Sequence, residues 1–357
     1  MSRLSRLHPW FGIIALHVGA AGAGYALSRT PMPMPWLIGP MTFSTLFGIF
    51  VGKITLPRLT RPLGQLVVAG VVGLTFTSSA LVAVATHFTA MIFVAIATIF
   101  TSLCAALVLK ACARIDFVTA CIASVPAGAI EMAALAEKYG ADAGPVAFVQ
   151  TLRLSLLVLI IPALLAALSG GVPESAAILG SSESDYSGGM LLLAIGLAGG
   201  VVFSIFRLNS PFFLGSLAFT AAAATFSLPI AMPPFWLLCS AQILLGIWLG
   251  SMFDRTMFTT MGSFVVSAIV STTVLVILAI ILALVVASMS GIDWRTMILA
   301  TAPGSVIEMA LTARLLEIDP AMVTAFHIVR IFMLLVLAPL VVRLSFKISI
   351  KKDAPPR

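Results

Sequence analysis

The 357-residue chain is 61% hydrophobic and only 9% charged, with a mean hydropathy of +1.15. Soluble globular domains usually carry about 25% charged residues, so this composition excludes a soluble domain and indicates a polytopic membrane protein. The net charge of +7 does not indicate a nucleic-acid partner. Its basic residues stand in short loops and the tail, where positive charge normally marks the cytoplasmic side of a membrane.

Twelve apolar stretches have the length that membrane-spanning helices need. In chain order they cover residues 10–28, 34–52, 63–86, 88–109, 117–136, 145–169, 189–206, 211–230, 234–252, 261–288, 294–313 and 321–345. The first stretch follows a short basic segment and could be taken for a cleaved signal peptide. An internal duplication argues instead that this stretch is retained.

The duplication appears when the sequence is compared with itself at an offset of 177 positions. Residues 116–163 then align with 293–340 without a gap, and about 14 of 48 positions are identical. Three identical pairs carry most of the argument: Pro126 with Pro303, Glu131 with Glu308, and Arg153 with Arg330. Fainter similarity reaches back to the first apolar stretch. We therefore expect a first membrane repeat (1–170), a polar extracytoplasmic linker (171–187), a second membrane repeat (188–346) and a basic cytoplasmic tail (347–357).

The number of full spans in each repeat decides the orientation of the second repeat. Six spans would make the repeats parallel, whereas five spans plus a returning hairpin would invert the second one. If 117–136 and 294–313 are the hairpins, both termini and most Lys and Arg outside the spans are cytoplasmic. We therefore predict an all-α polytopic membrane protein with two inverted repeats of five transmembrane helices plus one re-entrant or broken helical hairpin each. A twelve-span or otherwise broken arrangement remains the alternative.

The two predicted hairpins share an unusual pattern, "PAGAIEMA" at 126–133 and "PGSVIEMA" at 303–310. Proline removes a backbone donor and disfavours helix at the residue before it, while glycine accepts positive φ. Broken backbone at membrane depth needs protein or a water-filled cavity around it, and the half-helix that follows attracts anions at its N-terminus. The predicted binding residues of the two hairpins are Pro126, Gly128, Glu131, Pro303, Gly304 and Glu308.

Arg153 and Arg330 are the other candidate binding residues. Arg153 lies about 13 Å into its span at 1.5 Å per residue, and Arg330 repeats that depth. A charge at that depth is costly unless it is paired or hydrated. The expected partners are the two glutamates or a substrate carboxylate; the alternative is a structural bridge between each hairpin and the next helix.

Other polar residues have weaker patterns. His327 stands where the first repeat has Gln150, one turn before the arginine, so the two are candidates to line a path or to form an interhelical hydrogen bond. Four aspartates precede helices and are expected to be N-caps: Asp116, Asp142, Asp293 and Asp319. Glycines at GxxxG spacing, such as Gly246 and Gly250, indicate close helix packing within or between subunits. The histidines and cysteines have no metal-ligand spacing, so we expect no metal, no cofactor and no catalytic residue.

The doubled motif, each copy about twenty residues ahead of an arginine, resembles the AbrB family of bacterial inner-membrane proteins. That family arose by internal duplication and is often labelled ammonia monooxygenase or regulator. It is distantly similar to the cation:proton antiporter and anion transporter superfamily. The resemblance implies five spans plus a re-entrant hairpin in each inverted repeat, and scaffold helices that form a homodimer.

We therefore expect a secondary active transporter in the bacterial inner membrane, multi-pass, with both termini cytoplasmic. Its partners would be the lipid bilayer, a coupling proton or sodium ion, and a small solute such as an organic anion or amino acid. Glu131 and Glu308 would carry the ion, while Arg153 and Arg330 would hold the carboxylate. We expect no enzyme and no nucleic-acid partner. The alternative is a membrane-embedded regulatory or pore-forming protein without coupled transport.

Overall fold

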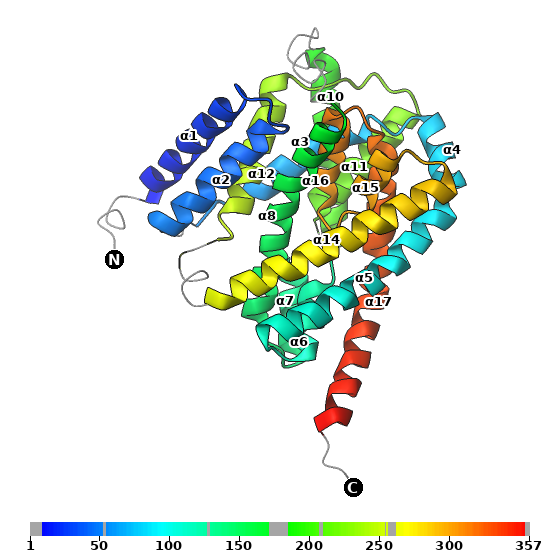
Figure 1. Ribbon diagram of the computed structural model, residues 1–357. Helices are drawn as coiled ribbons and strands as arrows, with labels where there is room; N and C mark the ends of the chain where they lie inside the picture. Colours follow the sequence, from blue (N-terminus) through cyan, green and yellow to red (C-terminus); the bar gives the residue numbers. More distant parts are fainter. Residues whose placement is uncertain are drawn as a thin grey trace. The chain divides into compact units, whose positions relative to one another are not determined.

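The computed structural model describes residues 9–52, 55–126, 129–170, 185–206, 210–253, 255 and 262–353. In this part of the chain the regular secondary structure is entirely helical and comprises fifteen helices (Figure 1). Four of the fifteen are long and apolar enough to cross a membrane: α5 (Phe88–Ala113), α8 (Ala143–Leu168), α10 (Tyr186–Ile205) and α14 (Gly262–Ser290). The apolar helices confirm the prediction of an all-α, membrane-type protein, while the inversion of the second repeat stays a prediction.

The helices group into two compact units, and each unit combines segments from both sequence repeats. The first unit comprises residues 1–85, 158–255 and 307–322, and the second comprises 86–157, 256–306 and 323–357. Besides α10 and the end of α8, the first unit contains α1 (Pro9–Leu27), α2 (Pro35–Phe50), α3 (Thr60–Gly73), α4 (Ser78–Thr86), α11 (Pro211–Thr225), α12 (Phe235–Gly250) and α16 (Val306–Leu315). Besides α5, α14 and most of α8, the second contains α6 (Phe117–Ser124), α7 (Ala129–Lys138), α15 (Trp294–Thr301) and most of α17 (Pro320–Asp353). Helix α17 thus runs through the first part of the predicted tail.

The helix pairs of the first unit follow the duplication. By sequence, α1, α2 and α3 correspond to α10, α11 and α12. Helix α1 packs on α2, as Figure 1 shows, and α10 packs on α11. Helix α3 packs on α11, and its counterpart α12 packs on α2. Each contact therefore recurs with the two repeats exchanged, so the duplication extends from sequence to packing.

Small residues allow α12 to approach α2 closely. A Cβ atom added at Gly246 would lie 2.5 Å from the carbonyl oxygen of Leu37, and one at Gly250 would clash with the carbonyl of Met41. Backbone atoms cannot yield as a flexible side chain can. The GxxxG spacing at these positions is therefore explained by a contact inside the chain.

The third predicted span, 63–86, is wrong as a single straight helix. It forms α3 and α4, which meet at an angle of 90° across a short break. The hydroxyl of Thr77 accepts a hydrogen bond from the backbone N–H of Ala80 (3.3 Å) at the start of α4, and Arg314 of α16 donates to the carbonyl of Val71 (3.3 Å) near the end of α3. A threonine cap and an arginine thus satisfy the freed backbone groups without proline.

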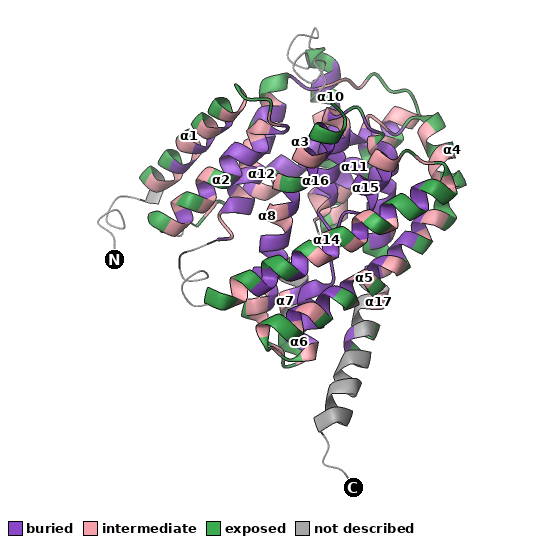
Figure 2. Cartoon of the chain, viewed as in Figure 1, coloured by how far each residue is buried: buried purple, intermediate pink, exposed green. Residues whose placement is uncertain are grey.

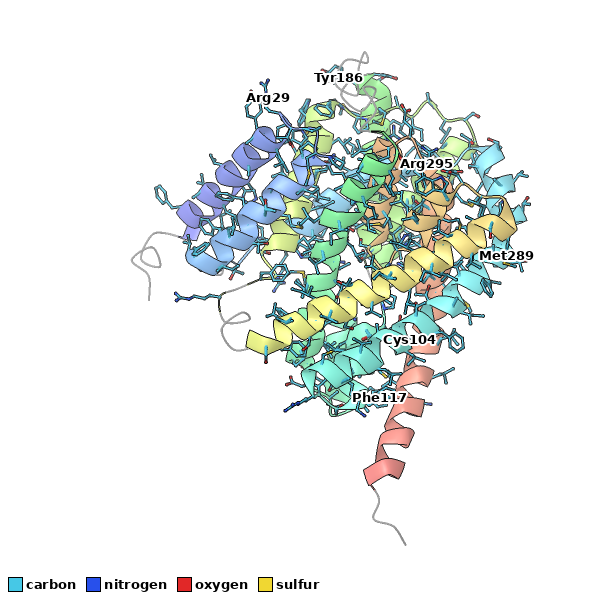
Figure 3. The ribbon with its side chains drawn as sticks, viewed as in Figure 1. Arg29, Cys104, Phe117, Tyr186, Met289 and Arg295 are labelled. Carbon is cyan, nitrogen blue, oxygen red and sulfur yellow. The ribbon has the colours of Figure 1, made fainter. Side chains whose placement is uncertain are left out.

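The second unit is built on α5 and α14, which run side by side in Figure 1. The hydroxyl of Ser271 in α14 donates to the carbonyl of Ala105 in α5 (2.9 Å), so a polar contact lies within an apolar pair. Figure 2 shows exposed and buried positions alternating along α14, as expected for a helix with one face outward. Cys104 and Met289, labelled in Figure 3, are exposed on α5 and α14. Helix α6 then packs on α5, and α15 packs on α14.

Candidate functional site

Both proline-containing segments interrupt a helix, as the sequence predicts. Helix α6 ends at Ser124, and the next residue, Val125, is extended with φ −63° and ψ 126°. Helix α15 ends at Thr301, and Ala302 is extended with φ −50° and ψ 130°. Each extended residue precedes a proline, whose ring excludes the helical conformation there. The following half-helices, α7 and α16, begin at Ala129 and Val306. Gly128 lies outside the described residues.

In the first repeat, α8 places two polar side chains against the end of α6. Arg153 donates from Nη1 to the carbonyl of Ser124 (3.1 Å) and from Nη2 to the Gln150 side-chain oxygen. Gln150 Nε2 lies 2.8 Å from the carbonyl of Val125 and 3.2 Å from those of Ile122 and Ala123. Both side chains are fully buried. Together they satisfy the carbonyl groups that the end of α6 leaves without intrahelical partners.

In the second repeat, α17 presents a related pair to the end of α15. Arg330 donates from Nη1 to the carbonyl of Ala302 (2.6 Å) and from Nη2 to that of Gly304 (2.9 Å). The same Nη2 lies 2.7 Å from Nδ1 of His327, whose Nε2 lies 2.9 Å from the carbonyl of Leu299. A guanidinium can only donate and a carbonyl can only accept. His327 is therefore a neutral ring with its proton on Nε2.

The buried arginines thus act first as helix caps. Each places a positive charge at the C-terminal end of a half-helix, where the helix dipole is negative. Within the described residues the ion pair that forms is the exposed one between Arg295 and Asp293, and neither buried arginine pairs with a described carboxylate. The described partners of the two arginines are backbone carbonyls and the side chains of Gln150 and His327. The expected pairing with the glutamates or with a substrate carboxylate stays a prediction, because the side chain of Glu131 lies outside the described residues.

The capping bonds leave part of each arginine unused. Arg153 and Arg330 belong to the same compact unit, and both side chains are buried. The Nε–H of each is buried and has no hydrogen-bond partner in the part of the chain that the structure describes. A buried donor of this kind normally finds a partner, and an uncompensated buried charge is costly. A buried guanidinium with an unused donor favours an anion, and each of the two breaks has one.

Glu308 occupies the first turn of α16 and is only 5% exposed. It lies three residues after Ser305, the spacing of a capping box, in which the acid reaches back to the first N–H groups of the helix. Both residues take part in interactions in the structure. The Ser305–Glu308 spacing is present in the sequence. It gives Glu308 a structural role, in a capping box, that was not among the roles expected for it. Glu131 lies in α7, but its side chain is outside the described part of the chain.

Three of the four predicted aspartate caps are confirmed. Asp116 accepts from the N–H of Thr119 (2.8 Å), Asp142 from that of Gly144 (3.0 Å), and Asp319 from that of Met322 (3.0 Å). Asp293 makes no side-chain cap and instead binds Arg295 at 3.0 Å, because a partner two residues away competes for its carboxylate. Among the described residues no three His, Cys, Asp or Glu side chains gather as metal ligands would.

The structure places seven of the ten predicted positions at the two breaks, all within the residues of the second unit. Arg153 and Gln150 meet the break at Pro126, and Arg330 and His327 meet the break at Pro303 and Gly304. Glu308 belongs to the residues of the first unit, where Thr312, one turn later, donates to Met34 Sδ (2.9 Å). The sequence pattern missed the carbonyl partners, because backbone acceptors leave no signature in residue types.

Comparisons with known proteins agree on one family over nearly the whole chain. The family model described as "Transition state regulatory protein AbrB" matches residues 36–345. The chain is 25% identical to "Uncharacterized protein YhjN" of Bacillus subtilis over 355 residues, which cover 92% of this chain and 91% of the relative. It is 24% identical to "Putative regulator AbrB" of Escherichia coli over 327 residues, which cover 90% and 93%.

Proposed function

The chain belongs to the AbrB family, and from this premise and its buried arginines we propose that it is a secondary active transporter of a small organic anion. The observation that carries the proposal is the pair Arg153 and Arg330. Both guanidiniums are buried, and the Nε–H of each has no hydrogen-bond partner among the described residues. Ionisable groups at membrane depth are functional candidates by default, and a carboxylate is one of the small anions whose geometry matches a guanidinium.

The interrupted helices support the same proposal. Discontinuous helices near the midplane are the usual binding elements of secondary transporters, because their ends offer unpaired backbone groups to ions and substrates. Here the carbonyl ends of α6 and α15 are occupied by arginines. The N-terminal ends of α7 and α16 remain as the attractive positions for an anionic group. The division of the chain into two compact units fits alternating access, which needs two bodies that move as wholes.

Glu131 and Glu308 are proposed to carry the coupling proton or sodium ion. Both stand in the first turn of a half-helix that follows a break. For Glu308 the burial of the side chain favours this role, since a buried carboxylate needs a bound cation or proton to compensate its charge. The capping-box spacing with Ser305 is compatible with coupling, because protonation would alter the start of α16.

The test is substrate-induced current in proteoliposomes. Small organic acids and amino acids are screened under proton and sodium gradients with the wild-type chain, Glu131→Gln and Glu308→Gln. Glu137→Gln is the matched control, because Glu137 lies on the same helix as Glu131 and is exposed. A current that both site variants abolish and the control retains supports coupled transport. A current that persists in both variants contradicts the coupling role.

The alternative function is a membrane-embedded regulatory or pore-forming protein. The names of the family model and of the Escherichia coli relative favour a regulatory role. A regulatory protein would give no current with any solute in the screen. A pore would give a passive conductance that is the same in the wild type and in both glutamate variants. Either result would move the assignment to this alternative.

A further inference from the structure

The first compact unit contains an open pocket of about 480 Å³ that the transport proposal does not use. It lies between the segment that leads into α3 and the end of α12, and its lining includes Thr55, Arg58, Arg61, Trp248 and Ser251. Helix α3 begins at Thr60 and α12 ends at Gly250. Apolar helices that cross a membrane end at the level of the lipid head groups. We place this pocket, at the ends of two apolar helices, at the level of the head groups.

Arg61 is held in place inside this pocket. Its guanidinium carbon stacks 4.4 Å from the ring centroid of Trp248, and its Nη2 donates to the hydroxyl of Ser210 at 2.9 Å. Arg58, on the same segment, is exposed and free to adjust. One fixed and one adjustable guanidinium suit a phosphate group, which accepts paired hydrogen bonds from arginine.

The surroundings of the pocket favour a lipid over a soluble phosphate. Leu59 and Leu63, next to the two arginines in sequence, are 62% and 49% exposed, and Phe50 at the end of α2 is 78% exposed. Exposed apolar side chains beside a basic pocket offer a path for acyl chains below a head group. The N-terminus of α3 has no side-chain cap, so its dipole adds to the attraction for an anion.

We propose that this pocket binds the phosphate of an anionic phospholipid, with Arg58 and Arg61 as its ligands and Trp248 as the ring that orients Arg61. Basic pockets between membrane helices are known to hold acidic head groups, and one arginine near a membrane surface contributes about fivefold in affinity. The site is independent of the proposed transport function and needs no knowledge of the transported solute.

The experiment measures lipid retention by native mass spectrometry of the purified full chain. The protein is prepared in detergent with equal amounts of palmitoyl-oleoyl phosphatidylglycerol and phosphatidylcholine. The variants are Arg58→Gln and Arg58→Gln with Arg61→Gln. Arg29→Gln is the matched control, because Arg29, labelled in Figure 3, also stacks on an aromatic ring, that of Tyr25 at 4.9 Å, at a helix end outside the pocket.

Preferential retention of phosphatidylglycerol by the wild type, reduced about fivefold in Arg58→Gln and further in the double variant, supports the site. Since Arg58 is exposed, its substitution leaves the packing of Arg61 intact, so a loss in that variant cannot come from misfolding. An equal loss in Arg29→Gln would overturn the proposal, because retention would then follow net charge alone. If millimolar inorganic phosphate displaced the lipid, the proposal of a lipid ligand would be wrong. The pocket would then be a site for a soluble phosphate compound.

Discussion

In the first repeat Arg153 binds one carbonyl of the interrupted helix directly, and Gln150 reaches three more. In the second repeat Arg330 binds two carbonyls, one on each side of Pro303, and His327 binds only one. The duplicated arginine was kept while the bonds were redistributed between it and its neighbour. The same substitution should therefore have different consequences in the two repeats.

The largest difference is expected when the arginines themselves are removed. Arg330→Gln leaves two buried carbonyls and a ring nitrogen without a donor, whereas Arg153→Gln leaves one carbonyl and the oxygen of Gln150. At about 1–3 kcal/mol for each buried unsatisfied group, we expect a loss of about 3–9 kcal/mol for Arg330→Gln and about 2–6 kcal/mol for Arg153→Gln. Thermal unfolding of both variants in the same detergent measures the order. Equal losses would show that the two arginine caps contribute equally to stability, which contradicts this prediction.

The sequence alone predicts the two helix breaks and the helices whose arginines support them. Proline and glycine inside apolar stretches locate both breaks, and the repeated arginines mark the helices that support them. The carbonyl partners were not predictable, because which backbone group an arginine reaches depends on the rotation of one helix against another. The bend between α3 and α4 was missed for a related reason: it contains no proline, and Arg314, which binds Val71, is distant in sequence.

The prolines offer a second test. Arg330 donates to backbone carbonyls on both sides of Pro303, whereas the one backbone carbonyl that Arg153 binds, that of Ser124, lies before Pro126. A proline inside a helix costs about 3 kcal/mol relative to alanine, so Pro126→Ala and Pro303→Ala both favour a continuous helix. We expect the first break to close more readily. Hydrogen–deuterium exchange should then slow around residue 126 in Pro126→Ala and change less around residue 303 in Pro303→Ala.

The contrary result would be informative about the bonds of Arg330 to these carbonyls. If exchange slows more in Pro303→Ala than in Pro126→Ala, the two bonds of Arg330 do not hold the second break open. The break would then depend on proline alone in that repeat, and Arg330 would follow the backbone rather than fix it.

Substitutions of His327, which stands where the first repeat has Gln150, test whether the two residues have the same role. His327→Gln places in the second repeat the group that the first repeat already uses to join a carbonyl to an arginine. We expect stability to change by less than about 1 kcal/mol, whereas His327→Ala, which leaves the carbonyl of Leu299 unpaired, should lose about 1–3 kcal/mol. Unfolding measurements on both variants decide this.

In proteoliposomes His327→Gln also removes a titratable ring, so a change in the pH dependence of the current would place His327 in proton coupling.

The smallest expected effect concerns the aspartates that precede the two interrupted helices. Asp116 accepts from both the N–H and the hydroxyl of Thr119, so Asp116→Ala should cost about 1 kcal/mol, the usual value of a helix N-cap. Asp293 makes no cap and pairs with an exposed arginine, so Asp293→Ala should cost less than about 0.5 kcal/mol. High salt should weaken only the second effect, because screening acts on exposed ion pairs and leaves a cap bond largely intact. If Asp293→Ala proved the more damaging, its carboxylate would have a role beyond the pairing with Arg295, and the difference between the repeats would begin before the breaks.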